Sequence, residues 1–241
     1  MAKKKSAVPK AAEKKRGKKY QVARALVERK LYPLAEAVAL LVRTSVTKFD
    51  SSCELHMNLG VDPKHADQVV RGTVVLPHGT GKAVRVIAFV SEAQEKTAKA
   101  AGAFEVGIDN LIEKITKGWL DFDVAVAEPA VMKNIGKIAK ILGQKGLMPN
   151  PKAGTVTPDV ASAIAEIKKG KVEFRVDKLA NLHNIFGKVS FGPEKLEENL
   201  KTVVQAVLQA KPTGVKGNYV NSLTLATTMG PGVSVDVSAL K

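Results

Sequence analysis

The segment Gly79-Thr80-Gly81-Lys82 is the first place where residue types and spacing could do chemistry, because glycines before a lysine can cradle a phosphate. A P-loop also needs another glycine at a fixed distance upstream, and a Ser or Thr after the lysine to hold magnesium. The upstream glycine is missing here, and Ala83 follows the lysine. The segment also precedes an apolar, strand-like run, whereas a P-loop follows a strand. We therefore do not expect it to bind a nucleotide.

The histidines and the cysteine do not form a catalytic or metal-binding set. No ligand spacing and no Ser-His-Asp or Cys-His combination can be assembled from the four histidines, which are His56, His65, His78 and His183. One cysteine, Cys53, allows neither an internal disulfide nor a cysteine zinc site, which fits a reducing compartment. The sequence therefore predicts a protein that is not an enzyme and that uses no metal and no cofactor. The alternative is a nucleotide-binding enzyme, which saturable binding of ATP, GTP or NAD in calorimetry would reveal.

Small polar residues on the exposed faces of predicted strands are the remaining candidates for chemistry. The strand 219–228 carries mostly hydroxyls on one face, at Ser222, Thr224 and Thr228, and is followed by Met229 and Gly230. Small residues let a nucleic-acid backbone approach closely, and hydroxyls can bond to phosphates and 2′-hydroxyls. The pattern alone leaves two interpretations open, an RNA contact or an ordinary Thr-rich edge strand.

The charge of the chain indicates a polyanionic partner, and its distribution limits how that partner is bound. The formal net charge is +15, of which +8 lies in residues 1–20. The rest of the chain is only mildly basic, so we expect shaped contacts with RNA more than bulk attraction. Aromatic residues make up 5% of the chain, which argues against binding single strands on aromatic platforms. No run of about 18 apolar residues is present, so we expect no membrane partner.

Two parts of the chain, 20–79 and 171–241, share an alternating strand pattern. In the segment 52–59 every second residue is apolar, and the same alternation returns at 172–177 and 219–228. Residues 171–190 suggest a hairpin-like region. Helices are predicted over 34–46 and from Gly192-Pro193 to Lys211-Pro212, each with an apolar stripe.

The middle part, 80–170, has a different pattern of apolar residues. Continuous apolar strands at 83–90 and 124–127 alternate with helices, which the pattern predicts over 92–101, 110–117, 131–142 and 158–169. Such alternation is typical of a parallel sheet covered on both faces. We therefore predict a discontinuous α+β domain, 20–79 plus 171–241, into which an α/β domain, 80–170, is inserted. Residues 1–19 are predicted to be a basic disordered tail, either a solubilising segment or an arm that orders along phosphates.

A lysine-rich face of the predicted helix 131–142 remains ambiguous. Lys133, Lys137 and Lys140 share this face, and Lys145 follows. A solvated surface is the commoner meaning of such a pattern, and a secondary phosphate contact is the functional one.

Several segments carry a more specific pattern. One is the run Leu142 to Val156, LGQKGLMPNPKAGTV, with glycines, prolines and a lysine in a fixed order. The others are Lys48-Phe49-Asp50, Gly72-Thr73-Val74, Leu76-Pro77-His78-Gly79, Gly81-Lys82, Gly118-Trp119 with Asp121-Phe122-Asp123, and Thr227-Thr228-Met229-Gly230-Pro231. Together, from about residue 18 to 233, the chain resembles the L-one family of large-subunit ribosomal proteins in its bacterial form.

The resemblance implies a fold and a function. It implies a discontinuous α+β domain with an inserted Rossmann-like parallel-sheet domain. It also implies binding to the mobile stalk of 23S rRNA beside the tRNA exit site, with assistance in releasing deacylated exit-site tRNA. In bacteria the family further represses its own operon by binding a similar structure in the mRNA. We accordingly expect a cytoplasmic protein of the ribosome that is a monomer when free.

Carried over residue by residue, the resemblance also implies a set of RNA-binding residues. They are Lys48, Phe49, Arg175, Lys178, His183, Ser222, Thr228, Met229 and Gly230. Ser52 stands where the family commonly has Thr, and because a hydroxyl is kept, we expect that contact to survive. The role of the Lys-rich residues 1–17 is not implied, and the run 142–156 could provide an auxiliary rRNA contact.

Overall fold

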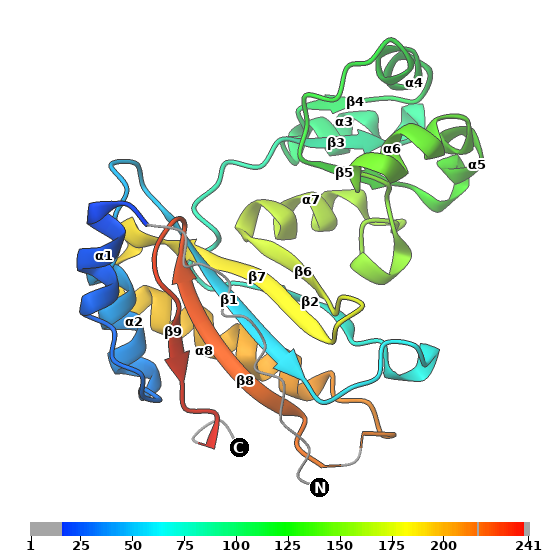
Figure 1. The fold of residues 1–241 in the computed structure, drawn as a ribbon. Coiled ribbons are helices and arrows are strands. Elements are labelled where there is room, and N and C mark those ends of the chain that lie inside the picture. The colour runs from blue at the N-terminus through cyan, green and yellow to red at the C-terminus, as the bar shows by residue number, and fades with distance from the viewer. Residues whose placement is uncertain (1–15, 216, 239–241) are drawn as a thin grey trace, which may run out of the picture.

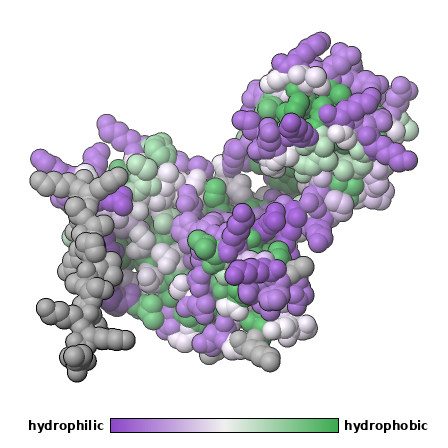
Figure 2. Space-filling model, turned by 45° about the vertical axis from the view of Figure 1, so that its right-hand side comes forward, coloured by the Kyte–Doolittle hydropathy of each residue, from purple (hydrophilic) through white to green (hydrophobic). Residues whose placement is uncertain are grey.

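The computed structural model describes residues 16–215 and 217–238, which form a mixed α/β structure with two antiparallel sheets and one parallel sheet (Figure 1). The parallel sheet and its helices stand apart from the larger antiparallel part. Figures 1 and 2 show two lobes that meet over a narrow region. Figure 2 shows hydrophilic side chains on both lobes, with hydrophobic residues between them. Among the described helices, none has the length and apolar character needed to cross a membrane.

The larger lobe is built on a four-stranded antiparallel sheet in the order β7-β1-β8-β9. Its strands are β7 (Asn181–Lys188), β1 (Ser52–Leu59), β8 (Val220–Thr227) and β9 (Val233–Val235). The alternation predicted for 52–59 is confirmed, since Cys53, Leu55, Met57 and Leu59 are buried. The helices α2 (Leu34–Arg43) and α8 (Gly192–Gln209) cover the buried face of the sheet. Among the described residues no helix covers the opposite face, the open sheet face, which carries polar residues from all four strands.

A two-stranded antiparallel ribbon, β2 (Arg71–Val75) and β6 (Lys171–Arg175), leads the chain into and out of the smaller lobe. The hairpin-like pairing predicted for 171–190 is therefore wrong for most of its length. β6 pairs with β2, and β7 pairs with β1, and only the isolated bridge between Val176 and Leu182 joins the two segments. Each strand finds its partner about a hundred residues away, which local alternation cannot indicate.

The smaller lobe contains a parallel sheet in the order β4-β3-β5, with β3 (Val86–Phe89) in the centre. The flanking strands are β4 (Glu105–Val106) and β5 (Val124–Ala127), and β4 was not predicted. On one face, Val86 and Ala88 pack with the helices α3 (Glu92–Ala100) and α7 (Val160–Lys169). On the other, Ile87 and Phe89 pack with α4 (Asp109–Thr116) and the segment 131–142. The predicted parallel sheet, covered on both faces, is confirmed.

The single helix predicted over 131–142 is wrong in detail. Two short α-helices, α5 (Met132–Ile135) and α6 (Ala139–Lys145), are separated by a 3₁₀ turn, Gly136–Ile138. Gly136 favours the break, because glycine loses more conformational freedom in a helix than any other residue. The buried face survives, since Val131, Ile135, Ile138 and Leu142 are all in the core. The lysines of this segment are exposed, as the pattern predicted.

The two chain crossings between the lobes meet at glycines. Gly79, with φ +66°, and Gly170, with φ +102°, lie so close that a Cβ on Gly170 would overlap the Cα of Gly79. Asn199 of α8 is fully buried beside them. Its side chain accepts from His78 N at 3.1 Å and donates to Gly79 O at 3.0 Å and Phe186 O at 2.8 Å. The crossings are therefore fastened to the core of the larger lobe.

The predicted tail overlaps a helix at its end. Most of residues 1–19 lie outside the described residues, but α1 (Lys18–Ala25) begins inside the predicted stretch. The guanidinium of Arg16 lies 5.0 Å from the ring centroid of Tyr20, and Ala23 is buried. These contacts order a segment whose composition alone indicates disorder.

Candidate RNA interface

At one end of the open sheet face, two segments that are far apart in the sequence lie side by side. Cys53 of β1 is paired with Thr227 of β8, so the segment before β1 lies beside the turn after β8. The pairing extends by one residue, because Thr228 N donates to Ser52 O at 3.0 Å. Six of the predicted RNA-binding residues therefore share this end of the sheet: Lys48, Phe49, Ser52, Thr228, Met229 and Gly230.

The turn after β8 holds Met229 in an exposed and strained position. Gly230 N donates to Thr227 O at 2.8 Å, which closes the turn. Met229 has φ +66°, a conformation that favours glycine, and the residue is 73% exposed. A Cβ on Gly230 would overlap Thr227 Oγ1, which is buried without a hydrogen-bond partner. A backbone held in this conformation with an exposed apolar tip is typical of a binding surface.

The hydroxyl of Thr228 is hydrogen-bonded to the main chain of β1. Its Oγ1 accepts from Ser52 N at 3.1 Å and donates to Ser52 O at 3.3 Å. Because a hydroxyl has one hydrogen and two acceptor positions, one acceptor position remains for a ligand. The sequence places Thr228 on the polar face, and the structure adds that it fastens the turn to β1.

The segment before β1 presents Phe49 on a rigid support. This residue is 60% exposed, although aromatic residues are usually buried. Thr47 Oγ1 donates to Phe49 O at 2.9 Å and also bonds to the hydroxyl of the fully buried Ser51. The next residue, Asp50, accepts from Ser190 N at 3.0 Å and from Ser190 Oγ at 2.7 Å. These bonds lower the pKa of the Asp50 carboxyl and fix the segment from both sides.

The middle of the open face carries two polar rows across the strands. One row runs from His183 through His56 to Thr224, and the next contains Asn181, Asn58 and Ser222. His183 and Ser222 therefore share the face with Thr228. Ser222 and Thr228 are six residues apart along β8, which is roughly 20 Å in an extended strand.

The amides of this face were not identified as candidate site residues. Asn58 Nδ2 donates to Asn181 Oδ1 at 2.8 Å, and Asn221 Nδ2 donates to Asn58 Oδ1 at 3.0 Å. Alternation placed Asn58 and His56 on this face, so a signal for them existed. No group of three or more potential metal ligands occurs in the described part of the chain.

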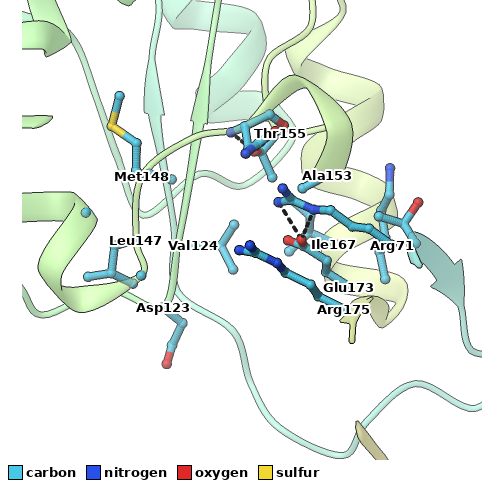
Figure 3. A pocket seen from close by; sticks show the side chains of 16 residues that line it. Arg71, Asp123, Val124, Leu147, Met148, Ala153, Thr155, Ile167, Glu173 and Arg175 are labelled. Carbon is cyan, nitrogen blue, oxygen red and sulfur yellow. Dashed lines mark hydrogen bonds and ion pairs between the residues drawn. The ribbon is translucent and has the colours of Figure 1, made fainter. Parts of the chain in front are cut away.

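Arg175 and Lys178 lie away from the sheet end. Arg175 is on β6 and enters a cavity of about 450 Å³ between the ribbon and the smaller lobe (Figure 3). Arg71 faces the same cavity and is paired with Glu173, with Arg71 Nη2 and Glu173 Oε1 2.5 Å apart. Lys178 lies in the turn before β7, where Asp177 Oδ1 accepts from Leu179 N and Asn181 N. The structure thus brings most predicted residues to one sheet face and these two to its flank.

The run 142–156 forms the opposite wall of that cavity. Its residues Gly143, Leu147, Met148 and Thr155 line it. Asn150 fixes the loop, because it accepts from Lys152 N at 2.9 Å through its side chain and donates to Thr155 Oγ1 at 2.7 Å through its main chain. The run therefore starts in the last turn of α6 and continues as a loop that hydrogen bonds fix between Asn150 and Thr155.

Comparisons with known proteins identify the family. The model of the ribosomal protein L1p/L10e family matches residues 41–231. The large ribosomal subunit protein uL1 of Thermobifida fusca (strain YX) is 54% identical over 228 residues, which cover 94% of this chain and 97% of that protein. The proteins of the same name from Salinispora tropica and Salinispora arenicola are 55% and 56% identical over 225 residues, or 93% of this chain and 94% of theirs. The chain therefore belongs to the ribosomal protein L1p/L10e family.

Proposed function

We propose that this protein is a structural constituent of the large ribosomal subunit that binds the mobile stalk of 23S rRNA next to the tRNA exit site. There it assists the release of deacylated tRNA, and it also represses its own operon by binding the mRNA. Membership of a ribosomal protein family supports a structural role rather than an enzymatic one. The names of its relatives support a place in the large ribosomal subunit.

The observation that carries the RNA-binding role is the end of the open sheet face. There an exposed aromatic ring, Phe49, and an exposed thioether, Met229, are both held by main-chain bonds. A rigid surface of this kind loses little entropy when it binds, and it suits the shaped minor groove and 2′-hydroxyls of folded RNA. The small residues between them, Ser52 and Thr228, leave room for the RNA backbone.

We also propose that the two lobes are separate domains. Residues 20–79 and 171–241 would form the discontinuous RNA-binding domain, and residues 80–170 would form the inserted Rossmann-like domain. The continuous core of the larger lobe, built from β1, β7, β8 and α8, supports this division. The sequence before residue 18 would contribute phosphate contacts of low specificity.

The test compares Phe49→Ala with Phe104→Ala. Both residues are more than half exposed, at 60% and 54%, but Phe104 lies on the smaller lobe. We expect Phe49→Ala to weaken binding to a transcript of the rRNA stalk by about tenfold, the loss of one stacking or packing contact. Phe104→Ala should bind like the parent protein. Equal affinities of all three proteins would contradict the proposed surface.

Two further measurements separate the parts of the proposal. Crosslinking with sequencing from cells should report the rRNA stalk, the operon mRNA and exit-site tRNA together. Deleting residues 1–17 should leave most of the affinity and give a shallower dependence on salt. Complete loss of binding in that variant would instead indicate an electrostatic RNA chaperone driven by the tail.

A further inference from the structure

Two histidines face each other across the open sheet face. His56 of β1 and His183 of β7 are paired in register, with their Nδ1 atoms 2.8 Å apart. The ring centroids are 5.0 Å apart and the rings are inclined at 63°. The side chains are 34% and 56% exposed, so both are accessible to a ligand.

The short distance between the Nδ1 atoms restricts where protons can be. A hydrogen bond between them needs one N–H and one lone pair, so one proton lies between the rings. If both rings are neutral, the donor ring has no hydrogen on its Nε2. If one more proton is added, both Nε2 atoms carry hydrogens while the inner bond is kept. A further proton would have to bind the accepting Nδ1, so that two Nδ1–H groups would face each other and the hydrogen bond would be lost. The geometry therefore suits two rings that together carry one positive charge.

The outer nitrogens have carboxylates nearby but do not bond to them. His56 Nε2 is 3.6 Å from Glu54 Oε2, and His183 Nε2 is 3.8 Å from Asp177 Oδ2. Both distances exceed those of hydrogen bonds, so the carboxylates leave the Nε2–H groups free for a ligand.

Two lysines add positive charge near the histidine pair. His56 and His183 line a groove of about 430 Å³, and Lys82, before β3, and Lys188 of β7 line it too. From β8 the neighbour of His56 is the uncharged Thr224, and β9 places Ser234 beyond it. Burial, and next the charge of His183, lower the pKa of His56, while Glu54 acts in the opposite direction.

We propose that His56 and His183 form one phosphate-binding unit, which shares a proton between the Nδ1 atoms and donates its two outward-pointing Nε2–H groups to phosphate oxygens of the RNA. The inference rests on the proposed RNA-binding function and adds His56 to the interface. An RNA phosphate stabilises the charged pair, so binding takes up a proton. The added affinity is full at low pH and is lost as pH rises through the range in which the bound pair releases its proton.

The binding test measures affinity for the rRNA stalk transcript at pH 6.0 and pH 8.0. We expect the parent protein to bind about tenfold more tightly at pH 6.0, the change for up to one proton taken up over part of this range. His56→Gln and His183→Gln should each remove most of this difference. His65→Gln, at an exposed histidine outside the sheet, is the control and should keep it. A difference that persists in both pair variants would overturn the proposal, as would its absence in the parent protein.

A second measurement does not depend on RNA. Nitrogen-15 spectra of labelled histidine in the free protein report the tautomer and charge of each ring. We expect the two rings to share one inner proton and the addition of a further proton to be suppressed. Two rings that take up protons independently of each other would refute the shared proton even if RNA binds. If the spectra agree but no RNA binds at any pH, the proposed function fails instead.

Inorganic phosphate distinguishes the source of the ligand. Millimolar phosphate should leave the histidine signals of the free protein nearly unchanged, because a single phosphate lacks the other contacts of the RNA. Saturation at that concentration would assign the site to free phosphate and overturn its assignment to RNA.

Discussion

Replacing Thr228 by Val tests whether the strand end acts by holding the turn in place. The substitution keeps the branched shape and removes the hydroxyl, which bonds to Ser52 N at 3.1 Å and to Ser52 O at 3.3 Å. Two net hydrogen bonds of about 0.5–1.5 kcal/mol each are lost, so the free energy of unfolding should fall by roughly 1–3 kcal/mol. Because the same bonds fasten the turn that carries Met229, RNA affinity should fall by about 1–2 kcal/mol, which is roughly 5- to 30-fold.

The assay combines denaturant unfolding with RNA titration, and Thr228→Ser is the matched control. Serine keeps the hydroxyl, so both quantities should stay within about 0.5 kcal/mol of the parent protein. If Thr228→Val lost stability but bound RNA normally, the turn would be a structural feature of the sheet and not part of the interface. If neither quantity changed, the two bonds to Ser52 would carry no net energy and the reasoning from them would be refuted.

Three further predictions concern the junction and the core. Asn199→Ala removes three hydrogen bonds of a fully buried side chain, including that to Gly79 O, and should lower the free energy of unfolding by about 2–4 kcal/mol in urea. Gly170→Ala would place a Cβ against the main chain of Gly79 at a φ of +102°, so it should lower the free energy of unfolding by at least about 2 kcal/mol. Gly118→Ala is the control, because Gly118 has a similar φ of +96° in open space, and it should lower the free energy of unfolding by about 1 kcal/mol. Burial raises the pKa of the Cys53 thiol to about 12, so the unfolded chain loses that proton first on raising the pH. Stability should therefore fall above pH 9 by up to about 1.4 kcal/mol per unit, and Cys53→Ala should flatten the slope.

The sequence predicts elements well where one periodicity dominates. The strand 52–59 alternates without a fault, and its burial follows residue by residue. The helix from Gly192 combines a proline start with one apolar stripe, and it ends within two residues of the predicted Lys211. The segment 131–142 shows the limit, because its buried residues fit an unbroken helix and a broken one equally well. Only the conformational cost at Gly136 favours the broken form.

Periodicity cannot predict which strands pair when they are far apart in the sequence. The ribbon needs β2 and β6 to meet across the whole smaller lobe, and alternation in each strand is silent about this pairing. The candidate site has the same character. Thr228 bonds to Ser52 over 176 residues, and His56 meets His183 over 127. Each residue type was visible in the sequence, but its chemistry depends on the register between strands.

Register also separates Arg175 from the predicted RNA-binding residues at the end of the four-stranded sheet. Arg175 alternates with Phe174 on a strand that belongs to the ribbon, so it enters the cavity beside the smaller lobe. Phe49 and Met229 lie at the far end of another sheet. An RNA that touches all three must therefore follow the open face along its length and reach the flank. This requirement favours a folded RNA with a defined shape over a flexible strand, since only a rigid ligand fixes such separated contacts at once.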